Sequence, residues 1–303
     1  MQTTSHILMI RPSHFEYNAE TAVNNSFQIN SGDQTVPQKA LQEFDLFVDV
    51  LGNYGIDVTV VQDTAVPYTP DSIFPNNWIS FHSDGTICLY PMFAENRRKE
   101  RKLTVLNTIA AKFELSSTVD FTEQEERERY LEGTGSMVLD RENKVAYACI
   151  SVRTDENVLQ QFCDEMGYTP IVFEALDIEG FPIYHTNVMM CVADRYVVVC
   201  LDSISNEIEK QELVAALLAT NKVIIPISLD QMNHFAGNML QVENSMGTKY
   251  LVMSSQAFHS LSIDQTNKLI SFNEIIHSDI STIESNGGGS ARCMMAEVFL
   301  PLK

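Results

Sequence analysis

The sequence predicts a closed α/β fold of one domain, spanning residues 1–303 and built from five repeats. The first observation is a pattern of two apolar stretches, a helical stretch and a third apolar stretch that recurs at a spacing of about 50 to 60 residues. The second is the composition, since 45% hydrophobic and 20% charged residues are typical of a chain with a sizeable core. The third is the last apolar stretch of the chain. It completes a repeat only if it pairs with the first apolar stretch, and this pairing would leave no free sheet edge.

The first repeat begins with an apolar strand at 7–10. Apolar residues then recur at helical spacing from Leu41 to Tyr54, and Pro37 suits the first turn of this helix as Gly55 suits its end. A strand at 56–61 follows the helix.

The next three repeats each show a hairpin, a helix and a further strand. Two apolar stretches around Ser83-Asp84-Gly85 predict the first of these hairpins, and the polar stretches 141–144 and 193–195 are the corresponding turns. The expected strands are 72–82, 86–90, 118–121, 135–139, 145–150, 171–173, 188–192, 196–201 and 223–227. The expected helices have apolar faces within 103–113, 158–166 and 208–218.

The fifth repeat has expected strands at 238–242 and 250–253. Ser262 and Gln265 form a capping pair that predicts the start of a helix, on which Leu269 and Ile276 would be apolar positions. The final stretch, 294–300, is the strand that would pair with the N-terminal one.

Charge and cysteine content exclude several classes of protein. The formal net charge of -20 disfavours nucleic acid and anionic membranes as partners, and no apolar run reaches the length of a membrane span. The N-terminus lacks the basic leader of a signal peptide. The six cysteines include no CxxC pair, and the seven histidines show no metal-ligand spacing. We therefore expect a cytosolic protein with reduced thiols and without a metal site.

Polar residues recur at the start of each repeat's first strand. If the repeats close into a ring, side chains at these positions converge on the central axis. A thiol, an imidazole and a carboxylate that meet there can act as nucleophile, general acid/base and orienting group. The positions are Asn76-Asn77, Glu132, His185, Asn238 and Cys293.

Each of these residues also has a structural interpretation when taken alone. Cys293, which follows the loop Gly287-Gly288-Gly289, could be a buried apolar thiol. Glu132 ends an acidic stretch, and His185 could be a hydrogen-bonded histidine at a strand end. Their equivalent positions in the repeats favour the catalytic interpretation.

Four motifs resemble the active-site motifs of the arginine deiminase and amidinotransferase, or pentein, superfamily. They are Phe74-Pro75-Asn76-Asn77, Glu132-Gly133-Thr134-Gly135, His185-Thr186-Asn187 and the segment 287–293. The N-terminal segment containing Thr21-Ala22-Val23-Asn24-Asn25 more narrowly resembles the citrulline-utilisation hydrolase group. The resemblance implies a closed five-bladed α/β propeller, with five ββαβ repeats around a pseudo-fivefold axis.

The resemblance also implies attack on an amidine or ureido carbon without a cofactor. Cys293 would be the nucleophile that forms a covalent intermediate, and His185 would protonate the departing amine and then activate water. Glu132 would hold the imidazole or the substrate. A protonated His185 would supply the positive charge that a thiolate needs at neutral pH.

Departures from the superfamily pattern bear on the substrate. Arginine deiminases carry aspartates where this chain has Asn77, Gly135 and Asn187. Carboxylates clamp a cationic guanidinium, whereas amides suit a neutral ureido group. We therefore expect hydrolysis of citrulline, or of arginine through to ornithine.

The remaining candidate residues are substrate contacts. Asp71 begins a stretch that resembles the dimethylarginine hydrolase motif. The α-amino and carboxylate groups of an amino acid would meet asparagine and arginine side chains, arginine being suited to a bidentate grip. Turn-forming roles remain open for the asparagines. The full set of expected substrate contacts is Asn77, Asn76, Asp71, Asn187, Asn24, Asn25, Arg292 and Arg11.

Several alternatives remain open at this point. An amidinotransferase, an arginine deiminase and a dimethylarginine hydrolase would use the same thiol and histidine. A non-catalytic propeller that binds a macromolecule would instead lack the Cys, His and Glu set and carry a basic surface. The small-molecule interpretation is favoured, and the sequence leaves open whether the chain forms a homodimer.

Overall fold

The computed structural model describes residues 1–303, and its strands form five sheets of three strands each. Every sheet consists of an antiparallel pair of strands and a third strand that runs parallel to the middle one. The strands are β1 His6–Arg11, β2 Asp57–Gln62, β3 Ile79–Phe81, β4 Thr86–Leu89, β5 Ser117–Asp120, β6 Val138–Asp140, β7 Val145–Cys149, β8 Thr169–Phe173, β9 Met190–Val192, β10 Tyr196–Val199, β11 Val223–Pro226, β12 Leu240–Glu243, β13 Lys249–Ser254, β14 Glu274–Ser278 and β15 Ala296–Glu297.

The last strand completes the first sheet, as the sequence predicted. β15 pairs antiparallel with β1, with Ile7 opposite Glu297 and Leu8 opposite Ala296. β1 also pairs in parallel with β2 over its whole length. Neighbouring sheets meet through their first strands where β15 contacts β3, β6 contacts β9 and β9 contacts β12.

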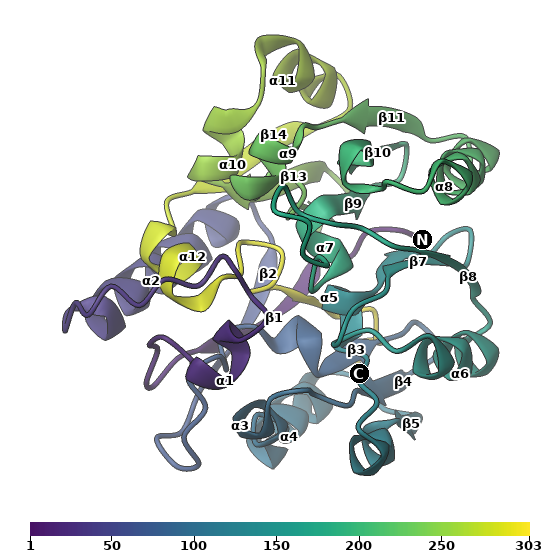
Figure 1. The fold of residues 1–303 in the computed structure, drawn as a ribbon. Coiled ribbons are helices and arrows are strands. Elements are labelled where there is room, and N and C mark those ends of the chain that lie inside the picture. The colour runs from purple at the N-terminus through teal and green to yellow at the C-terminus, as the bar shows by residue number, and fades with distance from the viewer.

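The longer helices connect the second and third strands of the sheets. They are α2 Val36–Asn53, α4 Leu103–Lys112, α6 Glu156–Met166, α8 Glu207–Ala219 and the pair α10 Ser255–Ser260 and α11 Ile263–Ile270. These helices lie at the periphery, whereas α5 and α7 lie near the middle of the view (Figure 1). The shorter helices are α1 Ala19–Ala22, α3 Glu95–Arg98, α5 Gly133–Ser136, α7 Thr186–Met189, α9 Leu229–Asn233 and α12 Ser281–Gly287.

Amphipathic faces bury the helices against the sheets. On α2, Phe44, Phe47 and Leu51 are fully buried, in agreement with the helical spacing of the sequence. The predicted capping box at the start of α11 is present, with Ser262 and Gln265 bonded reciprocally. None of the helices has the length and apolar character needed to cross a bilayer.

Two groups of expected elements differ from the structure. The first strand of three hairpins is shorter than predicted, because its leading residues fold as short helical turns: the 3₁₀ helix Pro75–Asn77, α5 and α7. Similarly, β15 covers only part of 294–300. Ile276 lies in β14 and not on a helix, because the β-branched pair Ile275 and Ile276 continues the ladder of β13.

Candidate active site

Glu132 and His185 occupy equivalent places in consecutive repeats. Glu132 is the residue before α5, and His185 is the residue before α7. Gly133, which follows Glu132, has a φ of 48°, and a Cβ there would lie 2.4 Å from the carbonyl oxygen of Asn76. Only glycine fits this close approach, so the sequence EGTG places the carboxylate next to the preceding repeat.

The Glu132 carboxylate is an ionised group buried among cations. Its Oε2 lies 2.8 Å from Nε2 of His185, 3.5 Å from Nη1 of Arg153 and 4.0 Å from Nη1 of Arg97. Its Oε1 accepts a hydrogen bond from the backbone N–H of Phe93. Burial alone would raise the pKa of Glu132, but these neighbours outweigh it and hold the pKa below its usual value.

His185 is a neutral imidazole at neutral pH. Burial lowers its pKa, and Arg153 and Arg97 lower it further, against the opposing effect of Glu132. Because a carboxylate can only accept, Nε2 carries the ring proton in the pair with Glu132. Nδ1 forms no hydrogen bond and is free to take up a proton. Desolvation, the largest effect, therefore works against the expected positive charge on His185, and Glu132 favours it.

The glycine-rich loop places Cys293 against neighbouring segments. α12 ends at this loop, where Gly288 has a φ of 64° and a Cβ would lie 2.5 Å from Nδ2 of Asn25. A Cβ on Gly289 would lie 3.0 Å from two atoms of the Phe74 ring. The glycines therefore allow the loop to contact both Asn25 and Phe74, and these contacts fix the loop that carries Cys293. The Cys293 residue is 3% exposed.

Two side-chain amides contact the sulfur of Cys293. Nδ2 of Asn238 lies 3.3 Å from Sγ, and Nδ2 of Asn187 lies 3.4 Å from it. Both residues are buried. The thiol thus faces two amide donors.

Cys293 and His185 line one narrow cavity. Its walls combine the glycine-rich loop with charged and amide side chains from several repeats. The lining residues are Thr21, Asn25, Gln28, Asp71, Phe74, Asn77, Arg97, Arg153, Tyr184, His185, Gly287, Gly288, Gly289 and Cys293.

Asn77 presents a free amide donor at this cavity. Its Oδ1 accepts a hydrogen bond of 2.8 Å from Nη1 of Arg97, which is itself held by Glu100 at 2.9 and 3.0 Å. This contact fixes the amide orientation, and Nδ2 is buried without a partner. A Cβ on Gly135 would lie 2.4 Å from this Nδ2 and 2.8 Å from Nδ1 of His185. A side chain at 135 would therefore displace both groups.

Asp71 presents a free acceptor. Its Oδ2 accepts hydrogen bonds from Nδ2 of Asn18 at 2.8 Å and Oγ1 of Thr21 at 2.9 Å. Its Oδ1 is buried without a partner. Burial raises the pKa of Asp71, although Arg97 and the two donors oppose this effect. A donor from a bound molecule would satisfy Oδ1.

A family model for eukaryotic N,N dimethylarginine dimethylhydrolases matches residues 11–300. The chain belongs to this family. The family is one of hydrolases, as the sequence predicted, and the predicted membership of the pentein superfamily is confirmed. Among curated proteins, none matches the chain significantly.

Solved structures of related enzymes share the fold of this dimethylhydrolase-family chain. The N-terminal domain of ArgZ, an arginine dihydrolase from Cyanobacteria solved with bound substrate, matches with a TM-score of 0.76 at 15% identity, over 98% of each chain. AgrE with L-arginine matches with a TM-score of 0.76 at 16% identity, over 98% of this chain and 40% of that one. A dimethylarginine dimethylaminohydrolase adduct with S-methyl-L-thiocitrulline gives 0.63 at 14% identity, over 98% and 100%. The chain spans 41% of the full-length ArgZ chain.

The two predicted arginine contacts of this family member lie away from the cavity. Arg11 binds Asp45 through two hydrogen bonds of 2.7 and 2.8 Å. Arg292 turns its guanidinium away from the cavity, where it binds Glu297 at 2.7 Å and the carbonyl oxygen of Met295 at 2.8 Å. Sequence adjacency to Cys293 gave no information about this direction.

The predicted asparagines divide between the cavity and its supports. Asn25 lines the cavity and donates to the carbonyl oxygen of Gly288. Asn24 accepts a hydrogen bond of 2.8 Å from Nε of Arg153, and so holds a cavity residue from outside. Asn76 bonds to Thr134 of the next repeat and does not line the cavity.

Sequence reasoning missed two arginines and left one asparagine without a role. Arg97 and Arg153 follow β4 and β7, the second strands of consecutive repeats, so an alignment of second strands is the signal that would find them. Asn238 stands at the predicted repeat position of the fifth repeat, and its contact with Cys293 gives that position a chemical meaning.

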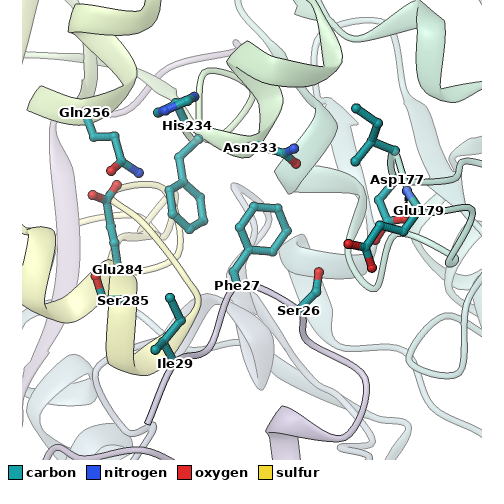
Figure 2. Close-up of a pocket in the computed structure, with 12 residues that line it drawn as sticks. Ser26, Phe27, Ile29, Asp177, Glu179, Asn233, His234, Gln256, Glu284 and Ser285 are labelled. Atoms are coloured by element: carbon teal, nitrogen blue, oxygen red, sulfur yellow. Dashed lines mark hydrogen bonds between the residues drawn. The ribbon is translucent and has the colours of Figure 1, made fainter. Parts of the chain in front are cut away.

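A larger surface pocket lies beside the cavity and contains neither Cys293 nor His185 (Figure 2). Phe27 stands in the middle of this view, and its ring packs against Phe235 at 5.0 Å between ring centres. Glu284 in the pocket wall accepts a hydrogen bond from Ser290 of the glycine-rich loop. The pocket is lined by neither the thiol nor the imidazole of the predicted set, so we place the chemistry in the narrow cavity.

Proposed function

We propose that the chain is a cysteine-dependent hydrolase that acts on the ureido or guanidino carbon of an arginine-related amino acid. Its substrate is citrulline, or arginine taken through citrulline to ornithine. The single observation that carries this proposal is the free Nδ2 of Asn77, whose Oδ1 is occupied by Arg97.

The donor of Asn77 distinguishes two kinds of substrate. A guanidinium group presents only N–H donors at its terminal nitrogens and needs acceptors. A ureido group replaces one of these nitrogens by a carbonyl oxygen, which needs a donor. An N–H of Asn77 suits this oxygen, and the space that Gly135 leaves empty allows the amide to stay in place.

The reaction follows from the free nitrogen of His185. Nδ1 takes the thiol proton of Cys293 as sulfur attacks the substrate carbon, and passes it to the departing ammonia. A covalent intermediate remains, which is thiouronium-like when arginine reacts and thiocarbamate-like when citrulline reacts. Nδ1 then takes a proton from water, whose oxygen attacks the same carbon and releases the sulfur. Arginine and water give citrulline and ammonia; citrulline and water give ornithine, carbon dioxide and ammonia. Glu132 stabilises the imidazolium formed in each step.

The rest of the cavity suits the α-groups of an amino acid. The unpartnered Oδ1 of Asp71 suits an ammonium group, and the guanidinium groups of Arg97 and Arg153 suit a carboxylate. A small amino acid would thereby give the unpartnered Oδ1 of Asp71 a donor.

Hydrolysis of dimethylarginine is the second candidate function, because the matching family model describes that activity. It would release dimethylamine and stop at citrulline. We also propose that the chain is a single domain whose five repeats close into a propeller. Because all six cysteines are unpaired, we place it in a reducing compartment such as the cytosol.

The test is incubation of the purified protein with arginine, citrulline and dimethylarginine in separate reactions. We expect ornithine from citrulline, and two ammonia per ornithine from arginine, without any added amine acceptor. Dimethylamine with accumulated citrulline would favour the second candidate. The Cys293→Ala variant should be inactive on every substrate, and unchanged turnover in it would refute the mechanism.

A further inference from the structure

The sulfur of Cys293 has no cationic partner in the free protein. The guanidinium of Arg292, the next residue, binds Glu297 and a backbone carbonyl. His185 is neutral at neutral pH for the reasons given above. Before proton transfer, the groups that contact this sulfur are therefore neutral amides, and the imidazolium that forms when His185 takes the thiol proton comes in addition to them.

The orientation of the Asn238 amide is determined by its other partners. Its Oδ1 accepts a hydrogen bond of 3.1 Å from the backbone N–H of Arg292. One hydrogen of Nδ2 goes to the carbonyl oxygen of Asn187 at 2.9 Å. The second hydrogen is therefore directed to Sγ of Cys293, 3.3 Å away. If the O and N atoms of this amide were exchanged, Nδ2 would face the N–H of Arg292 and Oδ1 would face the carbonyl oxygen of Asn187. Neither pair could form a hydrogen bond.

Asn187 provides a weaker constraint on the same sulfur. Its Nδ2 lies 3.4 Å from Sγ, but its Oδ1 is buried without a partner. Nothing except the sulfur sets the orientation of this amide. Asn238 is the donor that the fold holds in place.

The backbone before Asn238 is packed tightly against α7. A Cβ on Gly237 would lie 2.3 Å from the carbonyl oxygen of Val188 and 2.7 Å from the carbonyl carbon of Met189. Glycine is required at this contact, which places the start of the fifth repeat directly on the helix that follows His185. Asn238 is fully buried as a result.

We propose that Asn238 is a catalytic residue whose amide N–H donates to the Cys293 thiolate and stabilises it, with Asn187 as a second donor. This inference rests on the proposed function. The thiol proton goes to Nδ1 of His185, which lines the same cavity, and no other reactant is needed. In the uncharged state, the S–H group can instead donate to Oδ1 of Asn238, 3.7 Å away. The same amide thus serves both protonation states, and ionisation requires no rearrangement of the site.

The test measures the reactivity of Cys293 without substrate. Iodoacetamide alkylation is followed from pH 5 to 10 by mass spectrometry in wild type, Asn238→Asp and Asn238→Ala. Asn273→Asp is the matched control, because it also replaces a buried amide by a carboxylate while Tyr196 and Gln241 still find an acceptor. The other cysteines are buried too, and burial raises their pKa values, so alkylation reports on Cys293.

We expect both Asn238 variants to move the pH midpoint of alkylation upward by about one pH unit or more, a tenfold loss of thiolate at a fixed pH below the midpoint. The control should keep the wild-type midpoint. With citrulline or arginine as substrate, kcat should fall by a similar factor with KM little changed. An unmoved midpoint in a folded Asn238 variant, verified by circular dichroism, would overturn the proposal.

A titration of wild type against Cys293→Ala by thiolate absorbance near 240 nm covers the case in which neither variant folds. The proposal requires a midpoint below that of a free cysteine, about 8.5, and a midpoint at or above this value would overturn it. Alkylation of Cys293 and thiolate absorbance are both measured without substrate turnover. Failure of this inference is therefore distinguishable from failure of the proposed function, which product analysis decides.

Discussion

The substitution Asn77→Asp isolates the group on which the substrate assignment depends. It exchanges the unpartnered Nδ2 for a carboxylate oxygen and keeps the oxygen that accepts from Arg97 at 2.8 Å. The new carboxylate is isosteric, and its charge is matched by the same guanidinium. We therefore expect the variant to fold.

The size of the effect follows from the lost hydrogen bond. A ureido oxygen that faces a carboxylate in place of an N–H loses its partner, which costs about 1–3 kcal/mol, or roughly 5- to 150-fold in kcat/KM for citrulline. The first step on arginine should be retained, because a carboxylate accepts from a guanidinium. The added negative charge also raises the pKa of the nearby His185, so the acidic limb of the rate profile should move to higher pH.

The assay is the ratio of citrulline to ornithine from arginine, with ammonia measured in parallel. Wild type should give two ammonia per ornithine, and Asn77→Asp should accumulate citrulline with one ammonia per arginine consumed. Asn273→Asp serves as the control for a buried amide replaced far from the cavity. If Asn77→Asp converts citrulline to ornithine as fast as wild type, the amide does not select the ureido group and the reasoning fails.

Three further substitutions test the site and its surroundings. Gly135→Ala puts a Cβ 2.4 Å from Nδ2 of Asn77 and 2.8 Å from Nδ1 of His185. We expect at least a tenfold loss of turnover, and urea unfolding should show about 1–3 kcal/mol of destabilisation. Wild-type values for both measurements would contradict the tight contact. Glu132→Gln removes the carboxylate that stabilises the imidazolium, and kcat should fall about 10²- to 10⁴-fold, whereas a loss confined to KM would assign Glu132 to substrate binding alone. Burial raises the pKa of Glu284 to about 7, so its stabilising contribution is present below about pH 4.5 and is lost as the pH rises to about 7. The free energy of unfolding of Glu284→Gln should therefore exceed that of wild type by about 1–3 kcal/mol at pH 8, and this difference should disappear toward pH 5. A difference that does not change with pH would contradict the raised pKa of the buried carboxyl.

Repetition is the part of the structure that the sequence expresses directly. Each repeat carries its own apolar spacing, so Leu51 of α2 and the Ser262 cap of α11 were predictable from local pattern. The same register brought Glu132, His185 and Cys293 into one group before any distance was known. Local pattern also produced the errors, because Ile276 fits helical and alternating spacing alike until its ladder partner on β13 is known.

The arrangement of charged partners required the tertiary structure. Arg11 and Arg292 have side chains that could bind a substrate carboxylate. In the structure each is instead hydrogen-bonded to an acidic side chain outside the cavity. Arg97 and Arg153, which line the cavity, follow strands without any motif. A guanidinium binds whichever acceptors the fold brings to it, and those acceptors lie far away in sequence.

The sequence by itself determined the five-repeat register, the identity of the thiol, imidazole and carboxylate, and the absence of aspartates at 77, 135 and 187. Tertiary structure alone decided the lowering of the His185 pKa by burial, the direction of the Asn77 amide and the contact of Asn238 with sulfur. The physical reason is that spacing along the chain encodes which face of an element is buried. The pKa values and hydrogen-bond directions depend instead on the sum of burial and charge from every repeat that meets at the cavity.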